Sequence, residues 1–180
     1  MAAYTVDTAA SHVVIHTRAE GLLARLAHDL ELAARDVSGT AALDGDVWKA
    51  ELRVHTAEVR VVGAVHGDRV DTGTLSASER SDIERKMRED VFGSVTAIVV
   101  KAAGMSRHAG EATLIVGKAH ATSPLTLSAE ELPNGDVRAD GHFAVSLDAI
   151  GAKPIKGPLG AFRVKDAVEV AFKLTLRAAH

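Results

Sequence analysis

Residues 164–177 read VKDAVEVAFKLTLR, and apolar and polar side chains alternate along this stretch with a period of two. Val168, Val170, Phe172 and Leu174 occupy every second position. Successive side chains of a β-strand point to opposite faces of the sheet, so this alternation is typical of a strand with one buried face. The stretch therefore predicts one long, half-buried β-strand.

The same period recurs along most of the chain. It is found in residues 13–18, 30–35, 48–55, 114–116, 125–127 and 143–147. Turn signals separate these runs: Asp44-Gly45, residues 133–136 (Pro-Asn-Gly-Asp) and, less strongly, Gly67-Asp68. Strands joined by such short turns are antiparallel. The sequence predicts a mainly β fold with eight or nine strands.

One segment has a helical pattern instead. Residues 76–79 read Ser-Ala-Ser-Glu, a capping box in which the Ser hydroxyl and the Glu carboxylate satisfy free backbone amides. Apolar residues then recur at every fourth position as far as Val91. We expect one amphipathic surface helix near residues 77–91, ending near Gly93 and closing one end of the sheet. A weaker helical pattern covers residues 21–28.

Eight antiparallel strands hide their edges best by closing into a barrel. The Gly- and Pro-rich residues 151–160 are a loop and not a linker, because only one long strand follows them. We therefore expect residues 1–180 to form a single extended antiparallel β-barrel. Small inward side chains leave room for an apolar cavity. The residues predicted to line it are Val13, Ile15, Trp48, Ala50, Leu52, Leu114, Val116, Phe143, Val145, Val170 and Phe172.

Several short motifs resemble those of a known family. They are Tyr4-Thr5-Val6-Asp7 followed by Ser11, Val37-Ser38-Gly39-Thr40, Thr122-Ser123-Pro124-Leu125, and Gly151, Lys153, Pro154 and Leu159-Gly160 ahead of residues 164–170. Together they resemble the YceI-like proteins, a bacterial-type, lipocalin-like family that binds polyisoprenoids. The chain departs from the family at Ser146-Leu147-Asp148-Ala149-Ile150-Gly151, where the family's Arg and aromatic residue are absent.

The resemblance implies a lipid-binding or carrier protein that sequesters a long-chain amphiphile, of isoprenoid or fatty-acyl type, in an apolar barrel cavity. Binding of the tail would rest on burial of methylene groups, with a few polar residues at the mouth for the head group. Arg25, His28 and Lys153 are the candidates for that role. Replacing Ala50 or Val116 with Trp is expected to block the cavity and abolish lipid binding.

Two other readings remain open. The barrel could be packed solid and act as a scaffold through its outer surface. A more remote alternative is a hydrolase or metal protein using His28 and Asp29, although adjacent residues rarely orient each other for acid–base chemistry. The nine histidines are scattered, and no Gly-x-Ser-x-Gly, Walker or Gly-x-Gly-x-x-Gly motif is present. We assign no catalytic residue, metal ligand or cofactor, and expect a protein that is not an enzyme.

The amino-acid composition limits the classes of partner and site that the protein can have. The 21 Lys and Arg against 24 Asp and Glu give a net charge of -3, which excludes nucleic acid as the main partner. The absence of cysteine excludes disulfides and thiolate sites. No apolar run is long enough to span a membrane, and the first residues do not resemble a signal peptide. We expect a cytoplasmic protein, periplasmic or secreted only if a leader was removed, with a lipid partner and compatible with a homodimer.

Overall fold

The alternating C-terminal stretch forms the strand on which the sheet is built. In the computed structural model, which describes residues 1–22 and 27–179, this strand is β14 (Ala167–Ala178). Its inward residues from Val168 to Leu176 are buried or half-buried. The strand begins three residues later than the alternation predicts, because Arg163–Val164 (β13) pairs separately with Ala19–Glu20 (β3).

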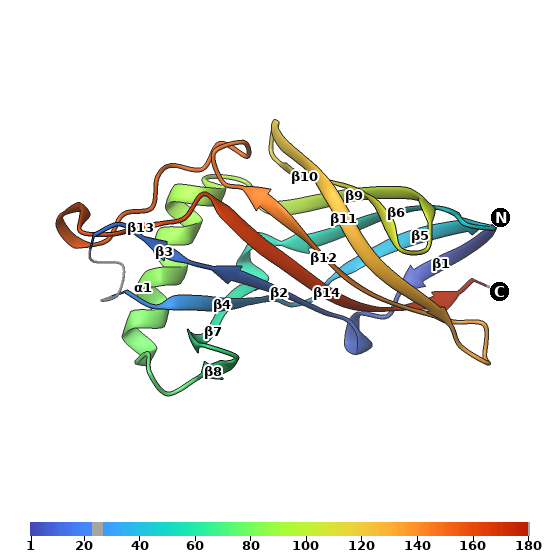
Figure 1. The fold of residues 1–180 in the computed structure, drawn as a ribbon, viewed down its shortest axis with the longest axis horizontal. Coiled ribbons are helices and arrows are strands. Elements are labelled where there is room, and N and C mark those ends of the chain that lie inside the picture. Colours follow the sequence, from blue (N-terminus) through green and yellow to red (C-terminus); the bar gives the residue numbers. More distant parts are fainter. Residues whose placement is uncertain (23–26, 180) are drawn as a thin grey trace.

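Eight strands close into an antiparallel barrel, which confirms the predicted architecture, and 59% of the structure is β. Around the barrel the order is β1, β5, β6, β9, β10, β11, β12, β14 and again β1. The remaining strands of the barrel are β1 (Ala2–Val6), β5 (Ser38–Asp44), β6 (Val47–His55), β9 (Ala97–Ser106), β10 (Ala109–Val116), β11 (Ala119–Glu131) and β12 (Val137–Ser146). Figure 1 shows both chain termini at the same end of this barrel.

At the other end the sheet continues past the barrel. The first half of β14 pairs with β2 (His12–Thr17) in place of β1, so the wall opens there. From β2 the order runs through the strands β4 (Asp29–Ala34), β7 (Val59–His66) and β8 (Arg69–Asp71). The molecule is thus a barrel that widens toward one end.

The helix closes the widened end (Figure 1). It comprises α1 (Ala77–Met87) and a π-helical turn, Arg88–Phe92, and matches the predicted segment. The predicted capping box is present: Glu79 N donates to Ser76 Oγ (3.2 Å), and Ser76 N donates to Glu79 Oε2 (2.8 Å). The hydrogen bond from the Ser76 backbone N is the largest cause that holds the pKa of the Glu79 carboxyl below its ordinary value. Glu84 ties the helix to β7, since its Oε1 accepts from Val61 N at 3.0 Å.

All three predicted hairpins are confirmed, including the weaker one at Gly67-Asp68, where His66 of β7 pairs with Arg69 of β8. Asp44 pairs with Val47 across the β5–β6 turn, and Glu131 pairs with Val137 across the β11–β12 turn. Gly45 has a φ of 64° in the first turn, a left-handed conformation that glycine adopts without strain. The turn residues therefore fix the register of these strand pairs.

The seam between β1 and β14 carries an ion pair. Arg177 Nε donates to Asp7 Oδ2 at 2.8 Å, while Asp7 Oδ1 accepts from the backbone N of Ala9 and Ala10. The hydrogen bond from Arg177 is the largest cause of the lowered pKa of Asp7, whose ordinary value is 3.8. A carboxylate with a lowered pKa adds stability above its unfolded pKa, and this contribution disappears as the pH falls through the folded value.

This pair predicts a pH-dependent effect of Asp7→Asn. The amide keeps an acceptor for Ala9 and Ala10 but loses the charge facing Arg177. We expect the variant to melt at a lower temperature than the wild type at pH 7, and the difference to shrink as the pH falls below about 4. Thermal unfolding of both proteins between neutral and acid pH measures it. A gap in Tm that is the same at every pH would contradict the role given to the charge.

Candidate functional site

Among the described residues, two cavities lie in the interior of the protein. The helix-side cavity, about 680 Å³, lies between α1, the wide end of the sheet and the loop of residues 155–164. The barrel cavity, about 130 Å³, lies inside the closed barrel. Both have predominantly apolar walls. The larger one falls within the roughly 300–1,000 Å³ typical of small-molecule sites, and the smaller is close to the ~150 Å³ of an engineered apolar cavity that binds benzene.

All eleven residues predicted to line the interior lie on one cavity or the other, but the structure divides them. The residues on the barrel cavity are Val13, Trp48, Ala50, Leu52, Phe143 and Phe172. Those on the helix-side cavity are Ile15, Leu114, Val116 and Val145. Val170 borders both. The sequence predicts that these residues line one continuous cavity. In the structure, Ala50 borders the barrel cavity and Val116 borders the helix-side cavity.

The side chains of the barrel cavity are held by close packing on glycine. The Trp48 indole lies against Gly104 and Gly110, where an added Cβ would come within 2.7 Å and 2.6 Å of the ring. Its Nε1 donates to Ser106 O at 2.8 Å, so the ring has a fixed orientation. Phe172 covers Gly141 in the same way. Both aromatic rings therefore pack against strand glycines of the barrel wall.

The helix contributes the apolar floor of the helix-side cavity. Ile83, Met87 and Val91, the residues of the predicted amphipathic pattern, line it together with Phe92. Opposite them stand Leu30 and other strand residues of β2, β4, β10 and β12. The amphipathic face of the helix is therefore turned toward a cavity, as well as toward the core.

Charged residues gather around the same cavity. Four basic residues, Arg18, Arg85, Lys86 and Lys156, border it, against the acidic Glu79 and Asp82. The two basic residues on α1 have carboxylate neighbours: Arg85 lies 3.6 Å from Asp82, and Lys86 lies 3.3 Å from Asp90. Within the described ranges, no carboxylate lies within 4 Å of the Arg18 or Lys156 side-chain nitrogens. These two cations are available to a ligand.

The structure places the three residues predicted to contact the head group in different surroundings. His28 borders the helix-side cavity, and its ring centroid lies 5.8 Å from that of His66 in an edge-to-face arrangement. Lys153 borders neither cavity; its side chain is exposed, and its backbone N donates to Asp90 O. Lys156, three residues further on, borders the helix-side cavity, which is the position expected for Lys153. Arg25 lies outside the described residues, as do residues 23–26 of the helix expected over residues 21–28, and its described residues 21, 22, 27 and 28 are not helical.

Asp29 makes a contact that joins two strands. Asp29 Oδ1 accepts from Ala19 N at 2.9 Å, which ties β4 to β3. The described residues show no hydrogen bond between the two side chains. Over residues 1–22 and 27–179, no group of three or more His, Cys, Asp or Glu side chains could hold a metal ion.

The segment that departs from the family motif has its own internal bonding. Ser146 Oγ accepts from Ala149 N at 3.1 Å, and Asp148 N donates to Asp166 Oδ1 at 2.8 Å. The turn carries Ile150 into the wall of the helix-side cavity, where it is buried. An apolar side chain therefore borders the cavity from this turn.

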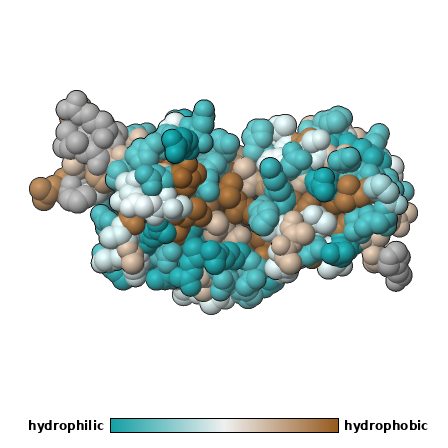
Figure 2. All heavy atoms as spheres, turned by 90° about the horizontal axis from the view of Figure 1, so that it is seen from below, coloured by the Kyte–Doolittle hydropathy of each residue, from teal (hydrophilic) through white to brown (hydrophobic). Residues whose placement is uncertain are grey.

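The outer surface carries both hydrophobic and hydrophilic side chains. Seen from below, apolar atoms form a band along the middle of the molecule, between hydrophilic ones (Figure 2). Among the described residues, no helix is long and apolar enough to cross a membrane.

Comparison with known proteins finds similarity in structure only. No family model matches the chain, and no curated protein matches its sequence. The crystal structure of Burkholderia cenocepacia BcnA is similar, with a TM-score of 0.67. The similarity covers 94% of this chain and 98% of BcnA, at 14% sequence identity. At this identity the two proteins share a fold.

Proposed function

We propose that this protein binds and carries a long-chain amphiphile, with its isoprenoid or fatty-acyl tail in the helix-side cavity. The observation that carries the proposal is an apolar space of about 680 Å³ bordered by charged side chains. Each methylene moved from water into such a space contributes about 0.8 kcal/mol, so a tail binds without any hydrogen bond.

The border of the cavity favours an acidic head group. Basic residues outnumber acidic ones there by four to two, and Arg18 and Lys156 have no carboxylate partner among the described residues. A carboxylate or phosphate placed between them would gain charge-assisted hydrogen bonds. Lys156 thus replaces Lys153 as the candidate, and His28 remains one.

Two further observations support a carrier. The barrel fold is similar to that of BcnA, and the motif resemblance to the YceI-like proteins extends over most of the chain, so we include membership of that family in the proposal. The alternative of a solid scaffold is disfavoured by the volume of the helix-side cavity. The proposal assigns binding and no reaction, and it needs one copy of the chain, since both cavities lie within it.

Native mass spectrometry of the purified protein tests the proposal. The protein is measured first as isolated and then with added palmitate, dodecyl phosphate or farnesyl phosphate. We expect a one-to-one adduct, and a weaker one with dodecanol, which has a similar tail but no negative charge. A bare polypeptide mass with all of these ligands would reject the carrier function and support the packed scaffold.

A further inference from the structure

Buried side chains centred on Val170 lie between the two cavities, and we refer to them as the layer. Phe143 of β12 pairs with Val170 of β14, Val170 pairs with Ile15 of β2, and Ile15 pairs with Leu32 of β4. Along this row the side chains pass from the barrel cavity to the helix-side cavity. Phe143 borders the first, Ile15 and Leu32 border the second, and Val170 borders both.

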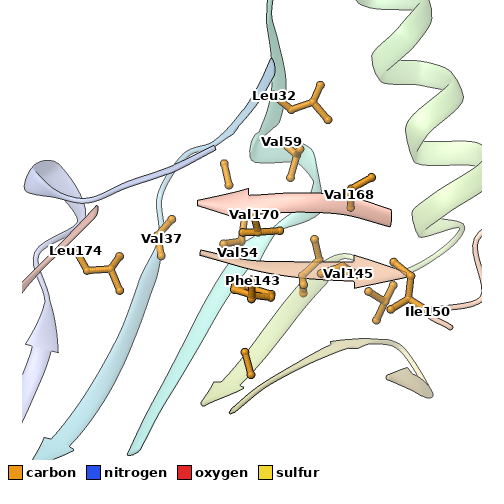
Figure 3. Packing of buried hydrophobic residues seen from close by; sticks show 14 of the residues in the cluster. Leu32, Val37, Val54, Val59, Phe143, Val145, Ile150, Val168, Val170 and Leu174 are labelled. Carbon is orange, nitrogen blue, oxygen red and sulfur yellow. The ribbon is translucent and has the colours of Figure 1, made fainter. Parts of the chain in front are cut away.

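Valines from other segments of the chain complete the layer, and they are buried to a similar degree. Val37 and Val54 border the barrel cavity with exposed fractions of 1% and 8%, and Val59 borders the helix-side cavity at 1%. Figure 3 shows Val54, Phe143 and Val170 grouped between the two ends of the interior. Phe143 and Val170 are themselves 5% and 8% exposed. Side chains with so little exposed surface leave little free space between the two cavities.

We infer that this layer sets the longest tail the protein accepts. The inference rests on the proposed function, because it concerns the same ligand. The tail extends from the charged border into the helix-side cavity and ends against Val170, and the barrel cavity stays outside its reach. The ligand class is therefore an amphiphile with one tail short enough for the helix-side cavity, and not a polyprenyl chain that fills the whole interior.

A series of saturated fatty acids from octanoate to eicosanoate tests the limit. In the wild type, Kd is expected to fall about fourfold per added methylene, the equivalent of ~0.8 kcal/mol, until the tail reaches the layer, and then to level off. Val170→Ala opens the layer toward the barrel cavity, so the fall is expected to continue to longer acids. Val137→Ala is the matched control, because Val137 is buried and borders the barrel cavity alone. In Val137→Ala, Kd should level off at the same tail length as in the wild type.

A second variant tests the inference even if Val170→Ala does not fold. Ala50→Trp fills the barrel cavity and leaves the layer untouched. Ala50 borders the barrel cavity alone, so the loss of lipid binding that the sequence predicts for Ala50→Trp no longer follows, and we expect the whole length series to bind it within about twofold of the wild type. Weaker binding of the longer acids to Ala50→Trp, or a wild-type Kd that falls steadily as far as eicosanoate, would overturn the inference and leave the carrier function standing. Failure of every acid to bind the wild type would instead reject the proposed function.

Discussion

Replacing Val116 with Trp is expected to weaken binding of palmitate at least a hundredfold. Val116 is buried at the end of β10 and points into the helix-side cavity. An indole at this position takes up space that the tail needs, and losing room for about four methylenes costs ~3 kcal/mol, more than a factor of a hundred in Kd. Isothermal titration with palmitate measures the loss.

The neighbouring residue provides a matched control. Ile115 lies on the same strand with the opposite orientation, so Ile115→Trp adds the same ring to the outer face. It should leave Kd within about twofold of the wild-type value. Circular dichroism of both variants establishes that the barrel is folded, since overpacking a core costs ~1–3 kcal/mol. A folded Val116→Trp protein that binds palmitate as the wild type does would place the ligand elsewhere.

Gly141→Ala is expected to destabilise the barrel by about 3 kcal/mol, at the upper end of ordinary single substitutions. An added Cβ would lie 2.8 Å from Phe172 Cζ and would also collide with the backbone oxygen of Thr126 on the adjacent strand. The ring could swing away, but the backbone of β11 is fixed by its ladder with β12. Urea denaturation followed by fluorescence gives the free energy of unfolding of each protein.

An exposed glycine separates this clash from the general effect of glycine replacement. Gly73 has no unusual φ, and the nearest atom to an added Cβ is Asp71 Oδ1 at 3.4 Å. Gly73→Ala should change the free energy of unfolding by less than about 1 kcal/mol, and a small stabilisation is expected from reduced freedom of the unfolded chain. Equal losses in the two variants would show that the close approach at Gly141 is not what matters.

Much of the fold follows from local signals. The alternation in residues 164–177, the Asp44-Gly45 turn and the capping box at Ser76 each act over a few residues, so a sequence read alone predicts the elements they produce. The inward face of every predicted strand follows from the same period. This is why all eleven predicted lining residues do line a cavity.

The division of the interior could not be predicted in this way. It depends on the point where β14 changes partner from β2 to β1, and strand pairing between residues more than 150 positions apart has no local signal. Alternation places Ala50 and Val116 on the inner face without saying which space each one borders. The loop lysines show the same limit: Lys153 and Lys156 belong to a segment without periodicity, and only its folded path brings Lys156 to the cavity.

The position of β14 in the sheet has a consequence for biosynthesis. This strand pairs with β12, β2 and β1, yet it leaves the ribosome after all three. Until then β1 and β2 have unpaired edges and the apolar faces of both cavities are exposed to other chains. The barrel therefore closes after translation of its other strands, by contacts between distant segments, which makes folding slow. During that interval we expect the nascent chain to bind chaperones that hold exposed apolar surface.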